Sequence, residues 1–443
     1  MSADQKGTVP TTRGPSGNGT TTSGPTSTGP TSNDASDDRA DAPPPPEPLT
    51  EPSGGVPPVI DTPEALERAV AELAAQDGVV AVDAERASGF RYGQRAFLVQ
   101  LRRSDGAIHL VDPIALPDLG ALAEVVNPLE WVLHAADQDL PCLRDLGLTP
   151  ASLFDTEIAA RLLGRARVGL AAVVADELGY ALAKEHSAAD WSTRPVPEDW
   201  RRYAALDVEL LAAAREAQLV ALARTGRLAW ALQEFEHERT APPPPAKVDP
   251  WRRTSGLQEV RRPRGLAVAR AVWEARERLA QELDRAPGRV LPAAAVVAAA
   301  RELPESRHAL TSLQEFSGKG TRRRADYWWS AVEEGLSVPD DALPARRPPR
   351  DPDALPQPRS WGDARPDAAT RLDAVRTALR ARADEIGIPQ ENLLAPAVQR
   401  RVAWDGAAPA DLDDVLLSHG ARPWQVEQAG PVVAAALAEA ATG

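Results

Sequence analysis

Proline-rich stretches limit how this chain can fold more than any other feature, because they divide it into separate units. The chain has 443 residues and 42 prolines. Residues 1–58 are rich in Thr, Ser, Gly and Pro and almost free of large apolar groups, so we expect a disordered tail there. Further proline-rich runs at 241–255 and 338–367 predict linkers. The units that remain with enough apolar residues to fold are residues 59–240, 256–337 and 368–443.

The first unit alternates short apolar runs with segments of helical periodicity. The predicted strands are 79–84, 95–103, 107–113, 131–135 and 152–156. The predicted helical segments lie at 137–146 and within 157–181 and 198–240. Strands in close succession, followed by strand–helix alternation, predict an α/β fold with one mixed sheet flanked by helices. The second and third units have helical periodicity with Gly and Pro stops, which is typical of small all-α domains.

Acidic side chains lie at three separate places in the first unit. Asp83 and Glu85 stand two residues apart at a strand end, so both point to one face of the sheet. Tyr203 and Asp207 stand four apart and share one face of a helix. Asp139 opens the helix that follows the fourth strand. Carboxylates suit hard divalent cations such as Mg²⁺ or Mn²⁺, whereas six scattered histidines and a single cysteine offer no zinc ligand set.

Each of these residues also has a structural interpretation when it is taken alone. A pair such as Asp83 and Glu85 is more often a solvated strand end, and a tyrosine such as Tyr203 is more often half-buried in a helix. We expect Cys142 in the core, and one cysteine cannot form a disulfide within the chain. The three acidic segments together favour a metal site over these interpretations.

Four stretches of the first unit resemble the ribonuclease D family of DEDD-type 3′→5′ exonucleases. They are VAVDAERASGFRYGQRAFLVQL, HAADQDL, FDTEIAARLLG and DWSTRPVPEDWRRYAALDV. The family pattern is D-x-E, then Asp, then Y-x-x-x-D, and all of these positions are present in order. Ala84 and Arg86 stand where the family often has Thr and Phe, which removes no ligand. The resemblance implies a ribonuclease-H-like mixed sheet flanked by helices, followed by two small all-α HRDC-like domains at 256–337 and 368–443.

The resemblance also implies roles for the site residues. Asp83 would bridge two divalent ions, either Mg²⁺ or Mn²⁺, and Glu85 and Asp207 would complete the site of the ion that activates water. Asp139 would hold the ion at the leaving group. Tyr203 would orient the attacking water, because its usual pKa of about 10 makes it too weak a base to act unaided.

Several further side chains could contact nucleic acid. Tyr92 in a loop and Gln100 on the second strand could line a pocket for the terminal nucleotide. For His134 we weigh packing against nucleotide contact, and for Trp191 and Arg194 we weigh fixing the loop before the last helix against direct contact. Acidic residues outnumber basic ones over 59–240, and the reverse holds over 251–340. The candidate phosphate contacts are Lys184, Lys319, Arg322, Arg323 and Arg324.

The resemblance therefore implies a 3′→5′ exoribonuclease, which we expect to be cytoplasmic and monomeric, with no membrane association. Its expected substrates are RNA 3′ ends, as in tRNA precursors or other structured RNA, and its products are 5′-mononucleotides. A DNA 3′→5′ exonuclease on the same fold is an alternative, because no motif reveals how a 2′-hydroxyl would be recognised. A catalytically inactive RNA-binding scaffold is a second alternative, which the complete set of acidic positions disfavours.

Overall fold

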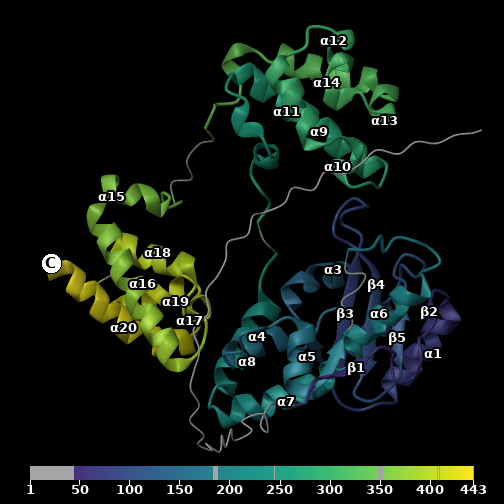
Figure 1. The fold of residues 1–443 in the computed structure, drawn as a ribbon, viewed down its shortest axis with the longest axis vertical. Coiled ribbons are helices and arrows are strands. Elements are labelled where there is room, and N and C mark those ends of the chain that lie inside the picture. The colour runs from purple at the N-terminus through teal and green to yellow at the C-terminus, as the bar shows by residue number, and fades with distance from the viewer. Residues whose placement is uncertain are drawn as a thin grey trace, which may run out of the picture. The chain divides into compact units, whose positions relative to one another are not determined.

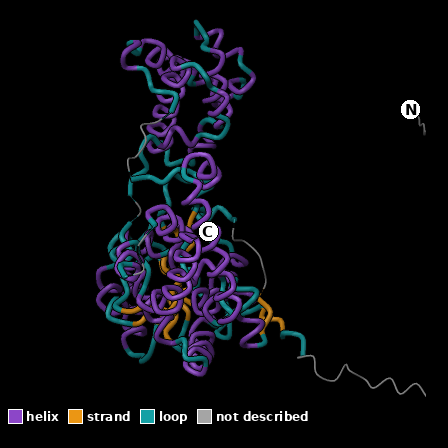
Figure 2. The backbone as a smooth tube through the Cα atoms, turned by 90° about the vertical axis from the view of Figure 1, so that its left-hand side faces the viewer, coloured by secondary structure: helices purple, strands orange, loops and turns teal. Residues whose placement is uncertain are grey.

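The computed structural model describes residues 44–182, 188–243, 245–347, 353–406, 408 and 410–442. Most of the expected N-terminal tail and Lys184 lie outside these residues. All strands of the described chain precede residue 183, and the parts that follow are helix and loop (Figure 2).

A six-stranded mixed sheet forms the centre of the first unit (Figure 1). Its members are β2 (Val59–Ile60), β3 (Val80–Arg86), β4 (Ala96–Arg103), β5 (Ile108–Val111), β6 (Glu130–Leu133) and β7 (Ser152–Asp155), in the order β2-β5-β4-β3-β6-β7. Strands β3, β4 and β5 pair antiparallel, whereas β6 pairs parallel with both β3 and β7. The predicted mixed sheet and its five strands are confirmed, and β2 is a short addition at the edge.

Helices cover both faces of this sheet. They are α1 (Pro63–Ala74), α2 (Gly120–Val126), α3 (Leu140–Asp145), α4 (Thr156–Leu162), α5 (Leu170–Leu178), α6 (Glu198–Glu209), α7 (Leu211–Arg224) and α8 (Leu228–Thr240). On one face, Val82 and Leu101 belong to the same apolar core as α1 and α2. On the other, Leu98 and Leu110 pack with Ala204 of α6. Helix α6 therefore lies over β3, β4 and β5, which brings its side chains to the end of β3.

The segment before the sheet differs from our expectation. We predicted disorder up to residue 58, but β1 (Glu47–Leu49) pairs parallel with β8 (Tyr180–Leu182). Pro52 is buried, and the Ser53 N–H donates to Glu209 Oε1 at 3.4 Å. The prolines and small residues that suggested disorder are ordered here by partners far away in the sequence.

The second and third units are all-helical, as predicted. The second contains α9 (Pro263–Glu282), α10 (Pro287–Val290), α11 (Ala293–Glu302), α12 (Arg307–Ser312), α13 (Lys319–Arg323) and α14 (Ala325–Ser337). The third begins earlier than the predicted residue 368, because α15 (Trp361–Ala364) lies in the predicted linker and Trp361 shares an apolar core with Leu372. It continues with α16 (Pro366–Ile386), α17 (Gln390–Leu393), α18 (Pro396–Asp405), α19 (Leu412–Ser418) and α20 (Pro423–Thr442). Val268, Val296 and Trp328 form part of the second unit's core. Across the described residues, none of the helices combines the length and apolar character needed to cross a membrane.

Candidate active site

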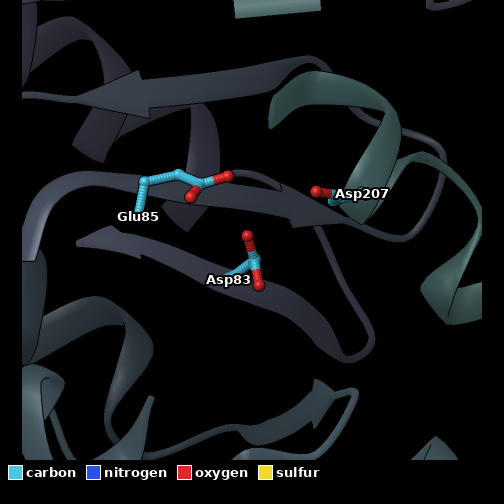
Figure 3. Close-up of side chains that lie close together, drawn as sticks. All are labelled: Asp83, Glu85 and Asp207. Carbon is cyan, nitrogen blue, oxygen red and sulfur yellow. The ribbon is translucent and has the colours of Figure 1, made fainter. Parts of the chain in front are cut away.

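Strand β3 and helix α6 bring three carboxylates together. Asp83 and Glu85 lie on the face of β3 that α6 covers, and the pairing with β4 becomes irregular between Glu85 and Arg86. Asp207 comes from α6. One carboxylate oxygen from each of these three acids lies within 4.8 Å of the others (Figure 3). Segments more than a hundred residues apart thus meet at one point.

Asp139 joins the same cluster from the neighbouring strand. It follows β6 through the 3-10 turn η1 (Ala136–Gln138) and directly precedes α3. Because β6 runs parallel to β3 with Val132 opposite Ala81, β6 ends beside the middle of β3, next to Asp83. The Asp139 side chain is buried and hydrogen-bonds to the Asp83 carboxyl, so all four acids form one cluster.

The cluster holds more negative charge than the protein neutralises. Burial is the largest cause that raises the pKa of all four carboxyls, and the charge of Asp83 raises the pKa values of the other three. The pKa of Asp139 reaches about 8, and those of Glu85 and Asp207 lie well above their usual range. Buried acids at this spacing are costly unless a cation offsets their charge. The site therefore fits hard divalent cations, which prefer oxygen ligands of this kind.

Arg86 supplies a positive charge inside this cluster. Its Nη2 lies 3.3 Å from Asp139 Oδ1, and its Nη1 donates to the carbonyl oxygen of Gln138 at 2.6 Å. The guanidinium lowers the pKa values of Asp83, Glu85 and Asp139, although burial outweighs it. From the sequence, Arg86 was noted only as a residue that removes no ligand, and this contact was not predicted. The available signal was a basic residue directly after two acids at a strand end.

Tyr203 lies one helical turn before Asp207 and donates a hydrogen bond to its carboxylate. Burial, followed by the charges of Asp207 and Glu85, raises the pKa of Tyr203 above its usual value. The hydroxyl therefore keeps its proton at neutral pH. Trp191 packs beside the tyrosine ring, with the ring centroids 6.4 Å apart.

Gln100 and Trp191 are buried, so neither side chain is exposed for nucleic-acid contact in this structure, and for Trp191 this favours the alternative that it fixes the loop before α6. Gln100 is 0% exposed, because it lies in the central strand β4 opposite Asp83. Neither atom of its amide has a hydrogen-bond partner among the described residues. Trp191 is 1% exposed and packs against Trp200.

Arg194 and His134 have partners within the protein, which favours the structural interpretation of each. Arg194 forms a two-point ion pair with Asp112, with distances of 2.5 and 3.0 Å, and also donates to the carbonyl oxygens of Phe97 and Trp191. These contacts fix the loop before α6. His134 Nδ1 lies 2.9 Å from Thr156 Oγ1, and burial lowers the pKa of His134 to about 4, so the ring is neutral.

The remaining predicted contacts lie elsewhere. Tyr92 is partly exposed in the loop between β3 and β4, whereas Lys184 lies outside the described residues. Four basic side chains in and beside α13 are exposed, and none forms an ion pair with another described residue; they are Lys319, Arg322, Arg323 and Arg324.

Three family models match parts of this chain. A 3′-5′ exonuclease model matches residues 57–217, and an HRDC domain model matches residues 265–332. A model described as a 3′ to 5′ exonuclease C-terminal domain matches residues 354–437. The third unit, which we predicted to be HRDC-like, thus matches a different model from the second.

Individual relatives agree with these matches. The ribonuclease D of Gluconacetobacter diazotrophicus is 32% identical over 288 residues, which cover 63% of this chain and 72% of the relative. A solved structure of a Bifidobacterium adolescentis protein superposes with a TM-score of 0.82 at 37% identity, covering 89% of this chain and 100% of that one. The structure of Escherichia coli RNase D, titled an exoribonuclease involved in structured RNA processing, has a TM-score of 0.62 at 25% identity. It covers 86% of this chain and 98% of that one.

Proposed function

Because this chain belongs to the ribonuclease D family and is a 3′→5′ exoribonuclease, we propose that the acids of its site hold two divalent metal ions, Mg²⁺ or Mn²⁺. The observation that carries this proposal is that carboxylate oxygens of Asp83, Glu85 and Asp207, three half-buried residues, lie within 4.8 Å of one another. Such ions, when bound, lower the pKa of water and stabilise the charge that develops during phosphodiester hydrolysis.

Each acid has its own place in this proposal. The charge of Asp83 raises the pKa of each of the other three acids, which supports its assignment as the ligand shared by both ions. Glu85 and Asp207 would complete one ion's site. Asp139, which contacts Asp83 from the end of β6, would hold the second ion at the leaving 3′-oxygen. Arg86 would keep the Asp139 carboxylate in place.

Tyr203 is proposed to orient the attacking water. Its hydroxyl is protonated and lies beside Asp207, so it serves as a hydrogen-bonding group and not as the base. The Trp191 ring beside it and the Arg194–Asp112 ion pair hold this part of the site in shape.

We propose that the substrates are the 3′ ends of structured RNAs such as tRNA precursors, trimmed one nucleotide at a time to release 5′-monophosphates. The exposed basic residues of α13 would bind the phosphate backbone, since four cations without a partner among the described residues lie close together there. The relatives named ribonuclease D are bacterial, and bacterial RNA ends lie in the cytoplasm, so we place the reaction there. We propose that the enzyme acts as a monomer, because the four acids and Tyr203 all come from one chain.

A digestion experiment tests the proposal. A 3′-extended tRNA transcript and a DNA oligonucleotide of matching 3′ sequence are incubated with Mg²⁺ and the wild type, Asp207→Asn or the surface control Asp176→Asn. We expect 5′-mononucleotides from the RNA with the wild type and the control, and a loss of about a hundredfold or more with Asp207→Asn. Undiminished release by Asp207→Asn would contradict the proposed site, and preferred trimming of DNA would contradict the proposed substrate.

A further inference from the structure

The turn that presents Asp139 is held by acidic side chains and an arginine from other elements. We call residues 135–139, between β6 and α3, the Asp139 turn. It begins with Ala135 in the left-handed region (φ 56°), a conformation that a non-glycine residue adopts only when its surroundings stabilise it. The turn therefore needs external hydrogen bonds to keep its shape.

Asp155 provides two of these hydrogen bonds. Its side chain, at the end of β7, is 0% exposed and accepts from the N–H groups of Ala135 at 3.3 Å and Ala136 at 2.6 Å. The same carboxylate caps α4 by accepting from Glu157 at 2.7 Å and Ile158 at 3.0 Å. One buried carboxylate thus ties the Asp139 turn to the start of the next helix.

Glu238, near the end of α8, holds the middle of the turn. Its Oε1 accepts from the Asp137 N–H at 3.0 Å, and its carboxyl also hydrogen-bonds to the Asp155 side chain. Burial and the charge of Asp155 raise the pKa of Glu238 to about 9, so the carboxyl is neutral and can donate its proton to Asp155. With Arg86 bound to the Gln138 carbonyl, each of residues 135–138 has a partner outside the turn.

We propose that Asp155 and Glu238 are positioning residues that hold the Asp139 turn so that the Asp139 carboxylate meets Asp83. Neither side chain is one of the four acids of the site. The inference rests on the metal-ligand role proposed above for Asp139. Loss of the support would displace Asp139, and a displacement on the order of 1 Å is enough to lower turnover about a hundredfold. Outer-shell partners of metal ligands affect metal affinity about 10- to 100-fold.

The test compares Glu238→Ala with Glu238→Gln in the full chain. A glutamine can still accept from Asp137 and donate to Asp155, whereas alanine can do neither. The matched control is Glu177→Ala, which removes another buried glutamate of the same unit, bound to Arg165 and distant in sequence from the turn. The readouts are kcat and KM on the RNA transcript, calorimetric titration of the RNA-free protein with Mn²⁺, and the melting temperature.

We expect Glu238→Ala to lower kcat about tenfold or more with KM nearly unchanged, and to weaken Mn²⁺ binding about tenfold. Glu238→Gln and Glu177→Ala should stay within about twofold of the wild type in both readouts. Wild-type turnover and Mn²⁺ affinity in a folded Glu238→Ala variant would overturn the proposal, as would equal losses in the alanine and glutamine variants.

If Glu238→Ala does not fold, Asp155→Asn provides the second test. It keeps the shape of the side chain but turns one acceptor into a donor, and it should lower Mn²⁺ affinity about tenfold. A folded Asp155→Asn variant with wild-type affinity would overturn the proposal. Asp139→Asn distinguishes a failure of the proposed metal site from a failure of the positioning role. An active Asp139→Asn enzyme would contradict the metal site itself. An inactive Asp139→Asn enzyme together with a fully active Glu238→Ala enzyme would contradict only the positioning role.

Discussion

Replacing Asp139 by asparagine should stabilise the metal-free protein at neutral pH, although it removes a proposed metal ligand. Burial and the Asp83 charge raise the pKa of this carboxyl from 3.8 to about 8 on folding. At pH 7 the unfolded chain would ionise it freely, whereas the folded protein must keep it protonated. Each pKa unit corresponds to about 1.4 kcal/mol. The penalty, which is the free energy of unfolding lost by keeping Asp139 protonated, is therefore at most about 4 kcal/mol at pH 7. Asparagine has no proton to retain and avoids this penalty.

The sign of the pH dependence follows from the raised pKa. The penalty is absent below about pH 4, grows as the pH rises, and is complete above about pH 8. At pH 5 it amounts to at most about 2 kcal/mol by the same conversion. The stability gained by Asp139→Asn should therefore be larger at pH 7.5 than at pH 5.

Thermal unfolding in chelator at these two pH values measures the effect. One kcal/mol corresponds to about 2–4 °C in the melting temperature of a unit of this size. Adding Mn²⁺ should reverse the order, because the wild type gains stability from bound ions and the variant gains less. A metal-free Asp139→Asn protein that is no more stable than the wild type at pH 7.5, or whose advantage is equal at pH 5, would refute this reasoning.

Three further variants test other parts of the site. Tyr203→Phe should lower kcat about 10- to 100-fold, because the water-orienting hydroxyl is lost. Its Mn²⁺ affinity in titration calorimetry should stay within about threefold of the wild-type value. A kcat equal to that of the wild type would exclude this role. Arg86→Gln should lower the melting temperature in chelator, because the acids lose their neighbouring cation, and an unchanged value would show that this charge is unimportant for stability. Changing the basic residues in and beside α13 to alanine should weaken the binding of structured RNA and make the binding affinity less dependent on salt concentration, with little effect on kcat. An unchanged dependence of the affinity on salt would place the phosphate contacts elsewhere. These residues are Lys319, Arg322, Arg323 and Arg324.

Local spacing in the sequence was enough to predict which side chains of the site share a face. Backbone geometry places residues two apart on a strand, or four apart on a helix, on the same face. Asp83 and Glu85 therefore share a face as expected, and so do Tyr203 and Asp207. The strands were predictable for a similar reason, because buried central strands need continuous apolar runs. Ordering the motifs along the chain added Asp139, although no local rule places it beside Asp83.

The features that the sequence did not reveal depend on partners far along the chain. Strand β1 forms because β8 offers it a backbone edge, which the composition near residue 47 does not show. Gln100 looked like a polar residue free for nucleotide contact, but a six-stranded sheet with a helix above it buries this position. Arg86 and Glu238 gained their roles from contacts with the Asp139 turn, which lies about 50 and 100 residues away from them.

Anomalous diffraction from crystals soaked in Mn²⁺ tests the central claim most directly, because it locates the ions without reference to activity. We predict two manganese peaks among the carboxylates of Asp83, Glu85, Asp139 and Asp207, with Asp83 contacting both. Manganese peaks only at other places on the protein, with these four carboxylates unliganded at saturating Mn²⁺, would contradict the account.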